Sequence, residues 1–197
     1  MIYLDLDRTL FQTSRVNEFW PVIESLYPQV DSVRAIAERE NYYQQLGDMY
    51  FHDVSEQLRD FGCDPVEVYE SLLETELADG RFEFEGVREL VAALLAKGQE
   101  VSVLTFGSDD YQRFKAALCP SLRELPVITT LRPKYEFIDN LEADDVWVVD
   151  DKPIGDEIAG LASFVQVSLE GISVPPDTTW PVFYNLRDVR VFFKKVL

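Results

Sequence analysis

The chain begins MIYLDLDRTL (residues 1–10), and this stretch decides the fold. Three apolar residues, Ile2 to Leu4, form a short run that breaks into charge at Asp5. A short apolar run bounded by polar residues is typical of a buried strand in a parallel sheet. In open α/β sheets, ligands bind at the carboxyl ends of the strands. The residues that directly follow each strand are therefore the candidates for chemistry.

The sequence after Gly86 alternates between helical and strand patterns. Further apolar runs predict strands at 101–104, 127–129, 146–149 and 164–169, and helical spacing predicts helices at 87–97, 109–118, 133–141, 154–161 and 186–196. Near-continuous apolar strands that alternate with helices indicate an α/β fold, with a parallel sheet covered by helices on both faces.

The segment between the first strand and Gly86 follows helical spacing instead, with breaks near Pro28 and Gly47. It predicts roughly four helices. We therefore expect an all-helical module, residues 14–85, inserted into an α/β core made of residues 1–13 and 86–197. Residues 16–85 contain 17 aspartates and glutamates against four arginines. Most of the net charge of the chain therefore belongs to this insert.

The composition excludes some classes of function. Across 197 residues, 36 acidic side chains face 18 basic ones, which gives a net charge of -18 and makes a nucleic-acid or anionic-membrane surface an unfavourable partner. A small phosphorylated substrate is still compatible, because a bound metal inverts the local field. Cys63, Cys119 and the single histidine, His52, form no zinc or disulfide pattern. The sequence has no secretory leader pattern and no membrane span, so we expect a soluble, cytoplasmic protein.

Three polar clusters follow the predicted strands. They are Asp5, Asp7, Arg8 and Thr9 after the first, Thr105 to Ser108 after the second, and Asp150 with Asp151 after the run at 146–149. Lys134 lies at a predicted helix start between the last two clusters. Carboxylates are ligands for a hard divalent cation such as Mg²⁺, and one can also act as a nucleophile toward phosphorus. Lysine and hydroxyl groups stabilise the charged phosphoryl oxygens.

The ordered set DxDxT, Thr105, Lys134 and the Asp150-Asp151 pair resembles the haloacid dehalogenase-like (HAD) hydrolase superfamily. The resemblance covers essentially the whole core. It implies a Rossmann-like parallel sheet, and it implies that the inserted module is the C1 cap, a lid over the active site.

The resemblance also implies roles. Asp5 is similar to the nucleophile, and Asp7 to the general acid that protonates the leaving group and later activates water. Because dehalogenases of this superfamily usually lack the second aspartate, Asp7 favours phosphate chemistry. Thr105, with the amides of Phe106 and Gly107, resembles the phosphate-binding group.

Lys134 resembles the lysine that neutralises nucleophile and phosphate, with Lys115 and Lys152 as competing candidates. Asp5, Asp7, Asp150 and Asp151 resemble the Mg²⁺ site. Either Asp150 or Asp151 can be the direct ligand, and we favour Asp150.

Some positions keep two interpretations. Arg8 stands where phosphatases of this superfamily commonly have glycine, and it either contacts the substrate or pairs with the acidic cap. Asp156 is either a further metal-site residue or a favourable charge at a helix N-terminus. His52 either lines the substrate entrance or packs as an ordinary surface histidine.

We expect a Mg²⁺-dependent phosphatase that acts on a small phosphorylated metabolite through an aspartyl-phosphate. The negative cap is expected to disfavour polyanions. Two alternatives stay open at this point: a phosphotransferase of the same fold, and a non-catalytic binding or regulatory module. The sequence does not indicate an oligomeric state.

Overall fold

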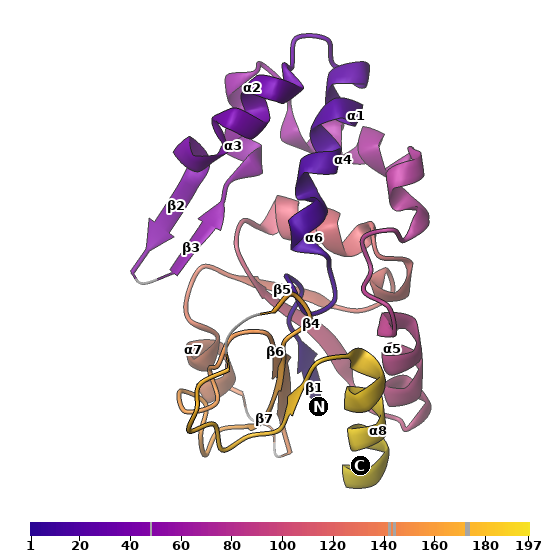
Figure 1. Cartoon of the computed structure of the whole chain (residues 1–197), viewed down its shortest axis with the longest axis vertical. Helices are drawn as coiled ribbons and strands as arrows, with labels where there is room; N and C mark the ends of the chain where they lie inside the picture. The colour runs from indigo at the N-terminus through magenta and orange to yellow at the C-terminus, as the bar shows by residue number, and fades with distance from the viewer. Residues whose placement is uncertain (48, 142, 144, 172–173) are drawn as a thin grey trace.

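A computed structural model describes residues 1–47, 49–141, 143, 145–171 and 174–197 of the protein. Within these residues, six strands form one sheet in the order β5-β4-β1-β6-β7-β8, and every neighbouring pair is parallel. The strands are β1 (Ile2–Leu4), β4 (Val101–Phe106), β5 (Val127–Thr130), β6 (Trp147–Asp150), β7 (Ser163–Val167) and β8 (Val182–Phe183). The first strand of the sequence thus lies in the middle of the sheet (Figure 1).

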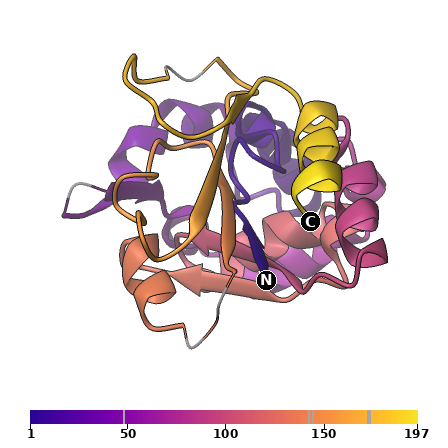
Figure 2. The same ribbon diagram turned by 90° about the horizontal axis from the view of Figure 1, so that it is seen from below.

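Both faces of the sheet are covered. Helices α5 (Val87–Ala96) and α8 (Leu186–Val196) pack side by side on one face, and α7 (Lys134–Asp139) lies on the other (Figure 2). The pleat of β1 divides its side chains accordingly. Ile2 and Leu4 belong to the hydrophobic cluster that includes residues of α5 and α8, whereas Tyr3 belongs to a second cluster with Ile138 of α7. The predicted α/β class, with a parallel sheet between helices, is confirmed.

The segment 154–161, predicted as a helix, forms a succession of turns instead. A left-handed φ of 81° at Gly160 interrupts helical geometry. The indole ring of Trp180 lies against Gly155 so closely that a Cβ atom there would be 2.2 Å from the ring. The helical prediction for this segment was therefore wrong, because long-range packing on Gly155 overrides the local apolar spacing.

The inserted segment contains helices α1 (Phe19–Leu26), α2 (Ser32–Ala37), α3 (Val54–Asp60) and α4 (Pro65–Leu73), and it also contains a β-hairpin. Strands β2 (Tyr43–Leu46) and β3 (Met49–His52) pair antiparallel, with Tyr43 opposite His52. The expectation of an all-helical cap was wrong. Aromatic residues with high strand propensity form this pair, including Tyr43 and Tyr50, whose rings pack edge to face at 5.8 Å.

The cap is docked on helix α6 (Asp109–Ala117) of the core. Phe114 of α6 stacks on Tyr69 of α4 with the ring centroids 4.6 Å apart, and it contacts Phe19 of α1 edge to face at 5.4 Å. The two chain segments that join cap and core are also paired, since Phe84 N–H donates to Leu10 O at 3.0 Å. Cap helices and core thus share one hydrophobic cluster.

None of the helices in the described part of the chain is long and apolar enough to cross a membrane.

Candidate active site

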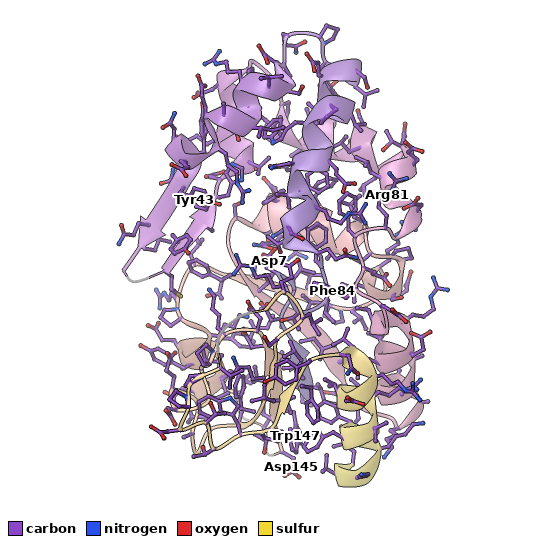
Figure 3. All side chains as sticks on the ribbon, viewed as in Figure 1. Asp7, Tyr43, Arg81, Phe84, Asp145 and Trp147 are labelled. Atoms are coloured by element: carbon purple, nitrogen blue, oxygen red, sulfur yellow. The ribbon has the colours of Figure 1, made fainter. Side chains whose placement is uncertain are left out.

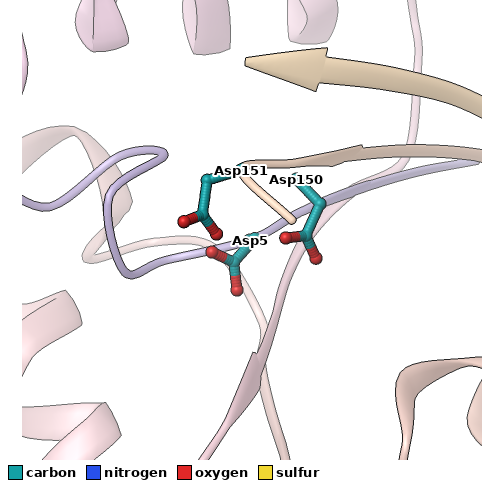
Figure 4. A group of neighbouring side chains, drawn as sticks. All are labelled: Asp5, Asp150 and Asp151. Atoms are coloured by element: carbon teal, nitrogen blue, oxygen red, sulfur yellow. The ribbon is translucent and has the colours of Figure 1, made fainter. Parts of the chain in front are cut away.

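Three aspartates meet at the carboxyl end of the sheet. Strands β1 and β6 are neighbours, with Leu4 opposite Val149, so the residues that follow in each strand, Asp5 and Asp150, lie side by side. Asp151 is the next residue along the chain. One carboxylate oxygen from each of the three lies within 4.8 Å of the other two, and all three residues are buried (Figure 4). The site is thus created by the strand register.

Lys134, the first residue of α7, holds two of these carboxylates. Its Nζ donates to Asp150 Oδ2 at 2.6 Å and also to Asp5 Oδ1. Burial lowers the pKa of Lys134, but the adjoining carboxylates of Asp150 and Asp5 outweigh it, and the net direction is upward. Burial raises the pKa of Asp5 to about 6, because it outweighs the attraction of Lys134. Of the three lysines considered from the sequence, Lys134, Lys115 and Lys152, Lys134 is the one bound to the nucleophile candidate.

The three carboxylates fit a divalent cation. When all are ionised they face a single ammonium, so the group has two negative charges in excess within a buried volume. Several carboxylate oxygens converging at this spacing are what a hard cation such as Mg²⁺ requires. A cation there would supply the missing positive charge.

Asp150 and Asp151 have different environments. Both oxygens of Asp150 are occupied by N–H donors, Oδ2 by Lys134 and Oδ1 by the backbone N–H of Lys152 at 2.8 Å. Among the described residues, no cationic side chain forms an ion pair with Asp151. Burial, followed by the charges of Asp5 and Asp150, raises the pKa of Asp151 to about 9. Asp150 is thus held by N–H donors, whereas Asp151 has no cationic partner in the described part of the chain. The preference for Asp150 drawn from the sequence stays a prediction.

Asp7 lies apart from this group, between the sheet and the cap (Figure 3). Lys115 Nζ donates to its Oδ2 at 2.5 Å and its Oδ1 at 2.6 Å, and Thr13 Oγ1 donates to Oδ1 at 2.8 Å. Burial raises the pKa of Asp7, but the Lys115 ammonium and these hydrogen bonds together lower it below its usual range. The carboxylate is thus held in place by donors from α6 and from the segment that leads into the cap.

Gln112 of α6 connects Asp7 to the second cluster. Its Nε2 donates to Phe106 O at 2.7 Å and to Asp7 Oδ2 at 3.3 Å, so its Oε1 is free to accept from Thr105 Oγ1 at 3.2 Å. Thr105 is buried inside β4, close to the strand end where it was expected. The Gly107 N–H already donates to Thr130 O at 3.1 Å, which argues against its predicted use as a phosphate donor.

Glycine is required at position 107 by the space around it. Its φ is 141°, and a Cβ atom there would lie 2.4 Å from Gln112 Nε2. The close approach lets Gln112 reach both Phe106 O and Asp7.

The remaining predicted residues lie around the site. Arg8 adopts a left-handed φ of 61°, which explains why glycine suits this position, and its guanidinium lies 3.8 Å from Glu170 of the core rather than beside a cap carboxylate. Lys152 Nζ lies 5.9 Å above the ring of Phe106. His52 lines the cavity described next.

A cavity of about 850 Å³ lies above the aspartates, between core and cap. Its core side is lined by the site residues, namely Asp5, Asp7, Arg8, Thr105, Phe106, Gln112, Lys115, Lys134, Asp151 and Lys152. Its cap side is lined mainly by the hairpin and the turn before it, namely Arg39, Tyr43, Leu46, Gly47, Met49, Tyr50, Phe51 and His52. The volume is within the range of sites that enclose a small organic molecule.

Sequence reasoning missed two positions and under-rated a third. Thr13 and Gln112 were not singled out, and Lys115 was considered only as an alternative to Lys134. Gln112 and Lys115 are three residues apart and so share a helix face. In the sequence, these two polar residues alternate with Tyr111 and Phe114, which pack into the core. This pattern could have indicated that the polar pair faces the site.

Comparison with known proteins identifies the fold. No protein-family model and no curated protein matches the chain. Solved structures do match over nearly its whole length. They include a haloacid dehalogenase-like hydrolase from Burkholderia xenovorans, at 16% identity and a TM-score of 0.64, with 96% of each chain covered.

Two further structural neighbours are similar. One is a beta-phosphoglucomutase-like protein from Thermotoga maritima, at 12% identity and a TM-score of 0.59, covering 100% of this chain and 99% of that one. The other is a HAD family hydrolase from Deinococcus radiodurans with bound phosphate and sodium, at 13% identity and a TM-score of 0.51, covering 98% and 94%. At these identities the likeness concerns the fold. The protein thus has the HAD-like α/β fold that its sequence motifs resemble.

Proposed function

We propose that this protein is a Mg²⁺-dependent phosphatase that hydrolyses a small phosphorylated molecule through an aspartyl-phosphate on Asp5. The observation that carries the proposal is the bridging of Asp5 and Asp150 by Lys134, beside Asp151, at the floor of the 850 Å³ cavity. A nucleophile, a charge-neutralising lysine and a set of metal-binding oxygens are thereby combined in one place. The bound phosphate and sodium of the Deinococcus structure support this reading of the fold.

In this proposal Asp5 attacks the phosphorus atom of a substrate phosphate placed at the carboxyl end of β1. The phosphorus–oxygen bond to the leaving group breaks as the bond to the Asp5 carboxylate forms. Lys134 keeps Asp5 oriented and compensates part of the negative charge of the phosphoryl oxygens. The Thr105 hydroxyl, buried beside Gln112, is positioned to contact those oxygens when its hydrogen bond at 3.2 Å is exchanged for the substrate.

Asp7 is the proposed acid for the first step and the base for the second. Because its pKa is low in the free protein, Asp7 must take up a proton as the substrate binds, and it donates this proton to the departing oxygen. In the second step it accepts a proton from the water that attacks phosphorus, while the bond between phosphorus and the Asp5 carboxylate breaks and inorganic phosphate leaves. Lys115, Thr13 and Gln112 fix its carboxylate for both transfers.

A divalent cation held by Asp5 and Asp151 would supply the positive charge that lets a phosphate dianion approach a carboxylate. The Asp7 backbone carbonyl is a further oxygen expected to reach it. Asp150 in this proposal fixes Lys134 instead of binding the cation. The cap covers the cavity and limits the access of bulk water during the reaction.

The experiment is a hydrolysis assay with 4-nitrophenyl phosphate and Mg²⁺, comparing the unaltered protein with Asp5→Asn. We expect turnover that depends on Mg²⁺ and that Asp5→Asn abolishes. Adding an alcohol acceptor and analysing the products distinguishes transfer to water from transfer to another acceptor. Absence of turnover over a broad panel of phosphate esters and divalent metals would favour the non-catalytic alternative.

A further inference from the structure

The cap has opposite electrostatic character on its two sides. Although residues 16–85 have a large excess of carboxylates, none of the described cap residues that line the cavity is acidic. The cavity side of the cap is aromatic and apolar, with Arg39 as its charged member within the described residues. The acidity of the cap is therefore directed away from the cavity in the part of the chain that the structure describes. The expectation that a negative cap repels polyanionic substrates does not follow from this arrangement.

Arg39 also differs from other arginines of the cap. Arg34 pairs with Glu38 at 2.9 Å, and Arg81 pairs with Asp79 at 3.0 Å. Arg39 forms no ion pair with any carboxylate in the described ranges, and its Nε is buried without a hydrogen-bond acceptor. A buried donor without an acceptor is unfavourable unless a ligand supplies one. This unsatisfied donor belongs to a residue that lines the cavity.

The side chains around Arg39 hold it at the cavity wall. Its guanidinium carbon lies 5.6 Å from the centre of the Tyr43 ring, and the Tyr43 ring in turn stacks on His52 at 5.4 Å. Figure 3 shows Tyr43 on the hairpin of the cap. Arg39, Tyr43 and His52 therefore form a row of packed side chains on the cavity wall, where a ligand can contact them.

His52 contributes no charge to this row. Gln57 Nε2 donates to Ala35 O at 2.7 Å, which leaves its Oε1 as the acceptor for His52 Nε2 at 2.9 Å. His52 Nε2 therefore carries a proton in this arrangement. Burial lowers the pKa of His52 to about 4, so the ring is neutral near pH 7. The positive charge of the row is that of Arg39.

The two lysines beside the site aspartates are already paired. Lys134 is bound to Asp5 and Asp150, and Lys115 to Asp7. Other core-side cations also line the cavity, including Lys152, which forms no ion pair in the described ranges, and Arg8, which lies 3.8 Å from Glu170. On the cap side, the cation within the described residues is Arg39. An arginine fork suits both carboxylate and phosphate, since each presents paired oxygens to its N–H groups.

We propose that Arg39 binds a second anionic group located on the leaving group of the substrate, so that the substrate is a phosphomonoester with two separate anionic groups. This inference rests on the proposed phosphatase function and adds a substrate class to it. The second group is a carboxylate or a phosphate, which share the chemistry that Arg39 recognises.

The test compares esters that differ only in the second charge. One arm uses alkyl phosphates of two to four carbons ending in a carboxylate, the other uses the corresponding bisphosphates, and the reference for both is the monophosphate ending in a hydroxyl. We expect kcat/KM of the unaltered protein to favour the doubly anionic ester in one arm by about 10- to 100-fold, the effect of a hydrogen bond to a charged group. The arm that shows the preference identifies the second group.

Arg39→Gln is expected to remove that preference, mainly through KM, and Arg39→Lys to retain part of it. The matched control is Arg34→Gln, a nearby cap arginine already paired with Glu38, which should preserve the preference. Thermal unfolding of each variant shows whether it is folded. Turnover of 4-nitrophenyl phosphate with no preference in either arm, or a preference that survives in Arg39→Gln, would overturn this inference and leave the phosphatase proposal standing. Failure of all turnover would instead count against the phosphatase proposal.

Discussion

Replacing Lys115 by methionine tests how the site holds Asp7. The Lys115 side chain is 4% exposed and the Asp7 side chain 29%, with Nζ 2.5 Å from Oδ2. The ammonium also lies 4.8 Å from the centre of the Tyr111 ring. Methionine keeps the apolar contacts of the chain and removes the charge. Asp7 would keep only Thr13 and Gln112 as donors.

The expected effect has two parts. Removing one partner of a buried ion pair costs about 3–5 kcal/mol of folding stability, and the partial exposure of Asp7 places this pair near the lower value. The general acid itself contributes about 10²–10⁴-fold to catalysis, so a displaced Asp7 should reduce kcat/KM for an alkyl phosphate by about 10²-fold or more. An aryl phosphate with a stable leaving anion requires little protonation and should lose less than about tenfold.

The assay measures kcat/KM for a series of phosphate esters of increasing leaving-group basicity, at a temperature where the variant is folded. Arg113→Met is the matched control, because it removes an exposed ion pair with Asp109 from the same helix. Its effect on stability should be below about 0.5 kcal/mol, with unchanged leaving-group dependence. Equal losses for alkyl and aryl esters in Lys115→Met would refute the argument that Lys115 acts through Asp7.

Three further outcomes follow from the site and its surroundings. Asp151→Asn should weaken Mg²⁺ binding by about 10–100-fold, as measured by isothermal titration calorimetry. Asp150→Asn should weaken it less, because both Asp150 oxygens already accept N–H groups. The reverse order would assign the metal to Asp150. Burial lowers the pKa of His52 from 6.5 in the unfolded chain to about 4 in the folded protein, so the unfolded chain binds the proton first as the pH falls. The free energy of unfolding should therefore decrease between these two pH values, by up to about 3 kcal/mol. In urea unfolding measured over a series of pH values, His52→Gln should remove this decrease. In the same assay, Gly107→Ala should reduce the free energy of unfolding more than Gly98→Ala does. Both glycines have a positive φ, but among the described residues only the Cβ added at Gly107 would lie 2.4 Å from a side-chain nitrogen. Equal losses would show that this close contact relaxes.

The strand ends could be predicted because their signal is local. Each apolar run of the sheet is short and ends in polar residues, so the positions of Asp5, Thr105 and Asp150 relative to the sheet follow from chain order and parallel pairing. The lysine that joins two of these carboxylates was also identified. Its place at the start of α7 made it a candidate, and the resemblance to HAD hydrolases selected it from the other lysines.

The rest depends on contacts between distant segments. The hairpin was included in a segment predicted as helical, and Gly47 was taken as a break between helices instead of a left-handed turn residue. The role of Lys115 requires α6 to lie with that face toward Asp7, 108 residues earlier in the chain. The charge of the cap was judged from its composition, whereas its effect on a substrate depends on which side chains face the cavity. Within the described residues, Arg39 is the charged residue of the cap that lines the cavity.

The central claim is that Asp5 becomes phosphorylated during turnover. It is tested most directly by acid-quenching the protein during hydrolysis of a radiolabelled aryl phosphate, followed by peptide mapping. We expect a hydroxylamine-labile label on the peptide that contains Asp5, and no label in Asp5→Asn. Turnover without a labelled peptide, or with the label on a residue other than Asp5, would contradict it.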